Sequence, residues 1–294
     1  MYLGKVGTGF GVERVTKVLA SSLVLLLLLG VPAGAQNPTR VKNIKLCTGV
    51  GTGADRASPD ARIEGCTALI DSGGEGQKVL TIVYSNRGNA YTAKGEYDRA
   101  IQDYDESIKL NPNYAKAFNN RGMAYRKKGE YDRAIEDFDN AIKLAPSYAI
   151  AFANRGGTYQ SKGAYDVAVR DYDQAIQHGP NLEAAWNGRC WTRAIVGELQ
   201  AALADCNQAL RLKANDAATL DSRGMVYLKL GQLDAAIDDY GSALRVDPKS
   251  ASSLYGRGLA KLKKGDTSGG NADVAAAKAI EAQIADDFVR YGIR

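Results

Sequence analysis

The sequence is poor in the residues that build metal sites and redox centres. Its 294 residues include one histidine, four cysteines, three methionines and two tryptophans. A single histidine excludes histidine-rich metal sites, and four cysteines without a Cys-x-x-Cys pair argue against a zinc ribbon or a thioredoxin-type centre. No HExxH, GxSxG or P-loop motif is present. We therefore expect no catalytic residue, no metal and no cofactor, and hence not an enzyme.

Long apolar runs are also scarce, and the one that exists lies near the N-terminus. Three basic residues precede a run from Val18 to Val31, which is shorter than the roughly 20 residues needed to cross a bilayer. Small residues follow at 33–35. The pattern is typical of a cleaved signal peptide over residues 1–35, with an uncleaved anchor as the alternative. It predicts an exported protein, periplasmic or secreted, without stable membrane insertion.

An excess of charge of one sign is missing as well. The chain carries 38 basic and 33 acidic residues, a net charge of +5. Removing residues 1–35 takes away three basic residues and one acidic residue, which leaves +3. A charge this small and this dispersed predicts no nucleic-acid partner.

What the sequence does contain is an internal repeat with a period of 34 residues, starting at Thr81. Position fifteen of every block is glycine, and position eight is glycine in five of the six blocks. Position twenty-four carries a large ring in four blocks, and proline occupies position thirty-two in four. We expect each block to form two amphipathic helices that turn at the position-fifteen glycine. The six predicted repeats are 81–114, 115–148, 149–182, 183–216, 217–250 and 251–284.

These columns resemble the tetratricopeptide repeat and its W-x2-LG-x2-Y…A-x3-F…P signature. The resemblance implies an all-α fold, a right-handed α-solenoid of six helix-turn-helix repeats, because one hairpin cannot bury its own apolar face. The whole arrangement is also similar to uncharacterised NRG-type repeat proteins exported by Gram-negative bacteria. In the second block the signature is met by Phe118, Gly122, Tyr125, Ala134, Phe138 and Pro146.

Both ends of the repeat array are expected to be capped. Residues 36–80 would form a Cys-bracketed N-terminal cap and a Gly-rich linker, in which 59–71 match the second helix of a degenerate repeat. Residues 285–294 would continue the last helix as an extended C-terminal capping helix. Phe288, Val289 and Tyr291 would lie on one side of it and seal the final groove.

Two further columns are charged in all six blocks. Position seven is arginine, from Arg87 to Arg257, and position twenty-three is aspartate, from Asp103 to Asp273. In an antiparallel hairpin the two positions lie within reach of each other. One hypothesis is an arginine ladder that binds anions. We favour a partly buried Arg–Asp pair that fixes the register between repeats, because every arginine has a matching acid.

The four cysteines are interpreted as two disulfides. Cys190 and Cys206 occupy positions eight and twenty-four of the fourth block, where other blocks carry a glycine and a ring that face each other. We favour a bridge within this hairpin; two buried free thiols or a redox function are the alternatives. Cys47 and Cys66 then pair by elimination and would tie the leading segment to the predicted helix 59–71.

In tetratricopeptide solenoids the first helix of each repeat lines the concave groove, chiefly through positions two, five, nine, twelve and thirteen. The resemblance implies a groove that is polar and basic in its first half and apolar in its second, with Trp191 as the strongest binding residue. Alternatively, Trp191 and Met225 pack between neighbouring first helices. The implied groove residues are Asn89, Lys116, Asn119, Met123, Arg126, Lys127, Asn187, Trp191, Met225, Leu228, Tyr255 and Leu259.

We therefore expect a non-catalytic scaffold or adaptor that binds a protein or extended peptide, of unknown identity, in this groove. The family's carboxylate clamp is broken here, because other residues stand at several of its basic positions. One alternative is a carrier or assembly factor for a cell-envelope polysaccharide, favoured if Trp191 and Tyr255 are exposed side by side. Another is a self-associating structural protein, a homo-oligomer, favoured if the terminal helix is buried in a dimer. His178 is interpreted as a packed or half-exposed helix-end residue rather than a ligand.

Overall fold

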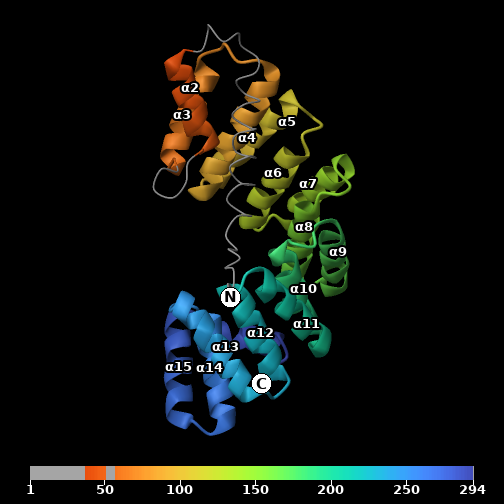
Figure 1. Cartoon of the computed structure of the whole chain (residues 1–294), viewed down its shortest axis with the longest axis vertical. Coiled ribbons are helices and arrows are strands. Elements are labelled where there is room, and N and C mark those ends of the chain that lie inside the picture. Colours follow the sequence, from red (N-terminus) through yellow and green to blue (C-terminus); the bar gives the residue numbers. More distant parts are fainter. Residues whose placement is uncertain (1–36, 51–56, 294) are drawn as a thin grey trace, which may run out of the picture. The chain divides into compact units, whose positions relative to one another are not determined.

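The computed structural model describes residues 37–50 and 57–293. These residues form fifteen α-helices and no strand (Figure 1). The signal peptide predicted over 1–35 lies outside the described residues. The chain divides into two compact units, Met1–Leu144 (unit 1) and Ala145–Arg294 (unit 2), and each is described by itself.

Unit 1 contains three helical hairpins. The first is the N-terminal cap, and the other two are the first two repeats. Within this unit, α3 packs on α4 and α5 packs on α6, so each hairpin contacts the next. The helices are α2 (Pro38–Thr48), α3 (Pro59–Asp71), α4 (Gln77–Ala93), α5 (Tyr97–Leu110), α6 (Ala115–Lys127) and α7 (Tyr131–Leu144).

Unit 2 contains the other four repeats and a short terminal helix. The first helices of neighbouring repeats contact one another and form the inner layer of the unit, and the second helices pack behind them. The helices are α8 (Ala149–Ser161), α9 (Tyr165–His178), α10 (Glu183–Val196), α11 (Leu199–Leu212), α12 (Ala217–Lys229), α13 (Leu233–Val246), α14 (Ala251–Lys264), α15 (Thr267–Ile280) and α16 (Ile284–Arg290).

The helix boundaries follow the 34-residue period. Every position-fifteen glycine ends or follows its first helix in the left-handed region, with φ between 74° at Gly231 and 94° at Gly265. A side chain at that φ would be strained, which explains why this column never varies. The small residue at position eight has a different reason. A Cβ added at Gly88 would lie 2.7 Å from a ring carbon of Tyr104, so the two helices could not approach as closely.

The charged columns form the Arg–Asp pair that the sequence favoured. In the first repeat, Arg87 Nε and Nη2 donate to the two carboxylate oxygens of Asp103, both at 2.8 Å. The same two-point pair recurs in every repeat at a spacing of 16 residues. Each arginine uses two of its hydrogen-bond donors for its own aspartate. The geometry therefore supports a structural Arg–Asp pair rather than an arginine ladder that binds anions.

The remaining guanidinium nitrogen reaches the preceding repeat. Arg121 Nη1 lies 2.5 Å from Asp105, Arg189 Nη1 lies 2.6 Å from Asp173, and Arg223 Nη1 lies 2.8 Å from Asn207 Oδ1. Each of these arginines therefore joins the two helices of its own hairpin and the hairpin before it. This is how the pair sets the register between repeats.

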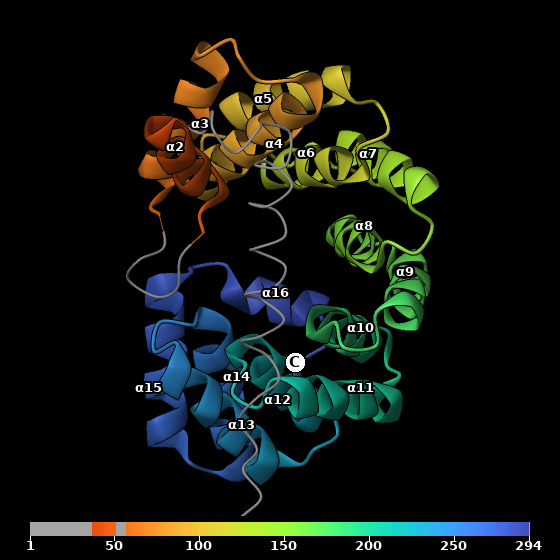
Figure 2. The same ribbon diagram turned by 45° about the horizontal axis from the view of Figure 1, so that its top comes forward.

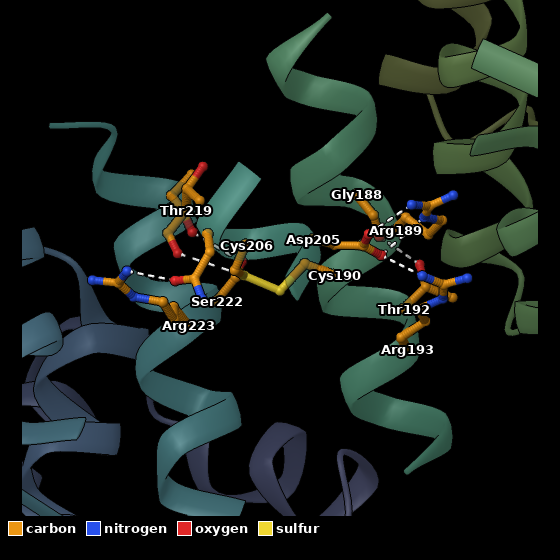
Figure 3. Close-up of a disulfide and its surroundings, with 12 residues drawn as sticks. Gly188, Arg189, Cys190, Thr192, Arg193, Asp205, Cys206, Thr219, Ser222 and Arg223 are labelled. Atoms are coloured by element: carbon orange, nitrogen blue, oxygen red, sulfur yellow. Dashed lines mark hydrogen bonds and ion pairs between the residues drawn. A yellow bond between two sulfur atoms is a disulfide. The ribbon is translucent and has the colours of Figure 1, made fainter. Parts of the chain in front are cut away.

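The cysteines form the two predicted disulfides. Cys190 and Cys206 join α10 to α11, and Cys47 and Cys66 join α2 to α3. Figure 3 shows the first bridge beside Asp205, which accepts hydrogen bonds from Arg189 and also from Arg193, at 2.7 Å. Arg193 stands at position eleven, where most repeats carry tyrosine. Its second contact to the buried aspartate gives that departure a structural reason.

Both caps differ in part from the sequence expectation. The helix expected over 59–71 is α3, but α2 was not predicted, although Asn37 accepts from the Thr39 amide as an N-cap and Pro38 opens the helix. At the other end, the expected extended C-terminal helix is wrong. The chain leaves α15 at Glu281, which is extended at φ −139°, and begins the separate helix α16 at Ile284. Val289 was expected on the packed side with Phe288, but it is exposed.

Candidate binding site

Except for Asn119, whose burial corrects the prediction, the predicted groove residues of unit 1 form a largely polar surface. Asn89 Oδ1 accepts from Tyr104 Oη at 2.8 Å and from Asn120 Nδ2 at 2.9 Å. Asn119 is buried and donates to Asn120 at 3.1 Å. Amide groups thus link the first helices of two repeats. Of the other predicted residues in this unit, Lys116 and Lys127 are exposed, while Met123 and Arg126 are partly buried.

The predicted apolar groove of unit 2 is corrected by the structure. Met225 and Leu228 are 3% and 4% exposed and belong to the core, so they offer no binding surface. Trp191, Tyr255 and Leu259 are partly buried and pack against that same core. The alternative interpretation, packing between neighbouring helices, therefore describes Met225. The physical reason is that a segment of the chain itself covers this face.

The covering segment is α16 with the residues that follow it (Figure 2). Its Phe288 is 2% exposed and meets the ring of Tyr255 edge-on at 4.8 Å between centroids. Tyr291 meets Trp191 edge-on at 5.0 Å. Lys229 Nζ donates to the backbone carbonyls of Ala194, at 2.6 Å, and Tyr291, at 2.8 Å. One ammonium group thus fastens the terminal segment to α10 and α12.

Beside this segment, unit 2 contains a pocket of about 770 Å³. Its walls come from the inner-layer helices α8, α10, α12 and α14, from the start of α9 and from the end of α16. The volume lies in the range of small-ligand or peptide side-chain sites. The lining residues are Gln160, Ser161, Tyr165, Asn187, Gly188, Trp191, Ala217, Ala218, Asp221, Ser222, Asp247, Ser250, Ser253, Arg290 and Tyr291.

Asp221 is the central polar group of this pocket. Its carboxylate accepts hydrogen bonds from Ser252 Oγ at 2.9 Å and from Ser253 Oγ at 2.5 Å. Burial raises the pKa of Asp221 above its ordinary value, and the two serine hydrogen bonds only partly oppose that rise. Within the part of the chain that the structure describes, no ion pair involves this carboxylate.

Two other oxygens in this region lack hydrogen-bond partners. Asn187 Oδ1 and Tyr240 Oη are buried and accept or donate no hydrogen bond among residues 37–50 and 57–293. In other repeats the corresponding tyrosine hydroxyl has a partner at position twelve, as when Tyr172 donates to Gln160 at 3.1 Å. The fifth repeat has Leu228 there, which explains why Tyr240 is left unpaired. Burial, and next the nearby Asp221, raise the pKa of Tyr240 well above its ordinary value.

Sequence reasoning found part of this pocket and missed its acid. Asn187 and Trp191 were predicted, whereas Asp221 and Arg290 were not. Asp221 stands at position five of its repeat, the same groove-lining position that pointed to Asn187. The signal was therefore present but was overlooked in favour of apolar residues. Nothing in the repeat pattern could have placed Arg290, because it lies beyond the last block.

Other candidate chemistry finds no support in the described residues. They contain no group of three or more histidine, cysteine, aspartate or glutamate side chains placed to hold a metal ion. His178 is exposed and stacks on the ring of Phe152 at 5.7 Å, a helix-end packing contact. None of the helices described is both long enough and apolar enough to span a membrane.

Comparison with known families matches three stretches of the chain. The family described as Tetratricopeptide repeat matches residues 115–148, and the family described as TPR repeat matches residues 88–127 and 224–265. Residues 88–148 and 224–265 of the chain therefore contain tetratricopeptide repeats. Tetratricopeptide repeats generally mediate protein–protein interactions, and their fold is typically a non-catalytic scaffold. Comparison with curated proteins found no match.

Solved structures share the tetratricopeptide fold at low sequence identity. A chain of the APC/C hetero-tetramer Cut9–Hcn1 superposes with a TM-score of 0.74 at 17% identity, covering 94% of this chain and 52% of that chain. The protein thus spans about half the length of that relative. A tetratricopeptide repeat protein from Parabacteroides merdae gives 0.64 at 17% identity, over 87% of this chain and 100% of that chain. Pseudomonas aeruginosa pilF gives 0.61 at 16% identity, over 74% and 97%.

Proposed function

We propose that this tetratricopeptide repeat protein is a non-catalytic scaffold that binds a segment of a partner protein, and that the segment enters the pocket of unit 2. The single observation that carries the proposal is the pocket itself. It lies on the inner-layer helices, and its walls include Asn187, whose buried Oδ1 has no hydrogen-bond partner among the described residues. Buried polar groups without partners are costly, and a bound peptide can supply the missing hydrogen bonds.

The pocket also fits a peptide better than the apolar groove that the sequence suggested. Trp191 and Tyr291 offer ring surface, while Ser161, Asn187 and Asp221 offer hydrogen-bonding groups. Such mixed walls suit an extended chain, whose amides need polar partners while its side chains need apolar ones. We infer that the polar inner face of unit 1, with Asn89 and Lys116, adds a second contact region.

The polysaccharide carrier is a weaker proposal. It needs Trp191 and Tyr255 exposed side by side, whereas each of them packs against a different residue of the terminal segment. Self-association through an exposed terminal helix is weaker for the same reason, because Phe288 is buried within its own chain.

Site-specific photo-crosslinking tests the proposal. A benzophenone amino acid at Ser161, on the exposed rim of the pocket, is compared with one at Arg170, which is exposed on α9 and lies outside the pocket. Each variant is incubated with an extract of the source organism and irradiated. We expect a discrete protein adduct from Ser161 and none from Arg170.

The other results contradict the proposal in different ways. An adduct only to a second copy of the chain would replace it with self-association. Equal adducts from both positions would mean that the pocket is not the site. No protein adduct at all would remove the scaffold proposal and bring the polysaccharide alternative forward.

We also propose that the protein is exported to the periplasm or secreted. Its four cysteines form two disulfides, and such bonds persist in oxidising compartments and are rare in the reducing cytosol. Fractionation of producing cells, with thiol alkylation of each fraction, tests this directly. Recovery of the chain in the cytosolic fraction with alkylated cysteines would contradict it.

A further inference from the structure

We propose that the pocket of unit 2 selects a cationic side chain, lysine or arginine, of the bound segment, and that Asp221 is the residue that reads its charge. This rests on the proposed function, since it names the chemistry that the same site would recognise. The broken carboxylate clamp would suggest no charge preference, and a basic groove would suggest an acidic peptide. The pocket has the opposite character.

The first step of the argument is the uncompensated carboxylate. Asp221 accepts one hydrogen bond from Ser252 and one from Ser253. An ionised carboxylate offers about four acceptor sites, so about two stay open. The buried aspartates of the second helices are each paired with an arginine; Asp205 on α11, for instance, receives both Arg189 and Arg193. Asp221 differs in having two neutral hydroxyls in place of a cation.

The second step is the surroundings of that carboxylate. Asn187 Oδ1, one repeat earlier at the same position, is a further acceptor without a partner among the described residues. The rings of Trp191, Tyr165 and Tyr291 line the same pocket. Aromatic faces attract ammonium and guanidinium groups, and their apolar bodies accommodate the methylene stem of lysine or arginine. Acceptor oxygens and ring faces together suit a long cationic side chain.

The third step is the charge balance of the lining. It holds two acids, Asp221 and Asp247, and one cation, Arg290. Arg290 is exposed and forms an ion pair with Asp287 of its own helix. It therefore lies at the rim of the pocket without neutralising Asp221. A cationic ligand would be attracted by Asp221 and repelled by Arg290, so substitutions of the two residues should act in opposite directions.

The test uses the full mature chain and four pools of acetylated, fluorescently labelled heptapeptides. The central residue is lysine, arginine, glutamine or glutamate, and the other positions are randomised over uncharged residues. Binding is measured by fluorescence anisotropy for the wild type, Asp221→Asn, Arg290→Gln and the matched control Asp238→Asn. The control removes the same charge from the exposed face of α13. Circular dichroism verifies that each variant is folded.

We expect the lysine and arginine pools to bind more tightly than the glutamine pool, and the glutamate pool to bind most weakly. Asp221→Asn should weaken the cationic pools about tenfold or more and leave the glutamine pool unchanged, because a desolvated charge pair is lost. Arg290→Gln should strengthen the cationic pools a few-fold. Asp238→Asn should change none of them.

Three results would overturn the inference, and they differ in what they say about the scaffold. If all pools bind alike and Asp221→Asn has no effect, the scaffold proposal stands and the charge preference is wrong. If the glutamate pool binds best, or no pool binds, the charge preference is wrong as well; in the second case the peptide-binding proposal for this pocket falls with it. Should Asp221→Asn fail to fold, Arg290→Gln keeps the inference testable, because it should strengthen the cationic pools and weaken the glutamate pool; no change in either pool would overturn the inference.

Discussion

In unit 1 the inner-layer helices α4 and α6 carry amides and exposed lysines, whereas in unit 2 helices α10, α12 and α14 carry rings and aliphatic groups beneath α16. The repeat frame is the same in both. Arg87 pairs with Asp103 in unit 1, and Arg223 pairs with Asp239 in unit 2 through the same two hydrogen bonds. The helical framework of the repeats is therefore independent of whether the inner face is polar or apolar. An apolar inner face, however, needs a cover, and here residues 284–293 supply it.

The largest expected effect comes from removing Phe288, the side chain that anchors residues 284–293 to unit 2. Phe288→Ala is expected to lower the free energy of unfolding of unit 2 by about 4 kcal/mol, because a fully buried ring leaves a cavity against Tyr255. Val289→Ala, at the next residue, is the control; it is 52% exposed and should cost under about 0.5 kcal/mol. Urea denaturation measures both.

Hydrogen exchange then locates the loss. Faster exchange of amides in α12 and α14, with α4 and α6 unchanged, is the expected pattern. Equal loosening of unit 1, or equal effects of the two substitutions, would show that α16 is not a local cover for unit 2.

The disulfides sharpen the comparison next. Replacing Cys190 and Cys206 by alanine should cost about 3 kcal/mol, because the bridge closes a loop with a sequence separation of 16. Cys190→Gly with Cys206→Tyr restores the glycine and ring that face each other in the first repeat. It should recover part of the loss and make the stability of unit 2 independent of reductant, while the Cys47–Cys66 bridge of unit 1 stays sensitive to it. Denaturation with and without reductant measures this; a Gly/Tyr variant less stable than the alanine variant would contradict it.

Smaller effects are expected from the shared Arg–Asp pair. Asp103→Ala should cost about 2 kcal/mol, because Arg87 is left partly buried without its partner. Asp205→Ala should cost about 1 kcal/mol more, since it removes a carboxylate partner from Arg193 as well as from Arg189. Equal losses in thermal unfolding would mean that the cation at position eleven contributes nothing.

The smallest expected effect concerns the lysine that fastens the cover. Lys229→Met removes two hydrogen bonds to carbonyls and should cost about 1 kcal/mol at neutral pH, after relief of the burial cost is counted. Matched unfolding experiments on wild type and variant measure it. A more stable variant would show that burial of the ammonium outweighs its hydrogen bonds.

Wild type and Lys229→Met also test the direction in which stability changes with pH in alkaline solution. Burial lowers the pKa of Lys229, so between that lowered value and about 10.4 the unfolded chain binds more protons than the folded one. Wild-type stability should therefore gain on the variant as pH rises through this window. A difference that shrinks with pH would contradict the assignment.

Much of this architecture could be predicted from the residues. The glycine at position fifteen, the close approach of Gly88 to Tyr104, the Arg–Asp columns and the Cys190–Cys206 bridge all follow from contacts inside one hairpin or between neighbours. Because such contacts recur at a fixed spacing, six copies of a pattern in one chain reveal them. The prediction was weakest where the pattern stops, at α2 and after Ile280.

The same limit of sequence patterns applies to the candidate binding face. Sequence position indicated that residue 225 belongs to an inner-layer helix, and the apolar residues of the C-terminal segment predicted a seal for the final groove, but neither showed which residues that segment would cover. Likewise, position five assigned Asn187 and Asp221 to the same face without showing that Asp221 is held by serines of the next repeat instead of a cation. These are long-range facts about what each side chain meets.

The sequence by itself determined the repeat, its helices, its turns and its disulfides, because local spacing and contacts within each hairpin decide them. Only the tertiary structure decided that residues 284–293 leave the last repeat helix and pack over α10, α12 and α14, with Met225 in the same buried core and a polar pocket at Asp221. The physical reason is that burial depends on which distant segment occupies a surface. A non-repeating tail leaves no periodic trace of where it will pack.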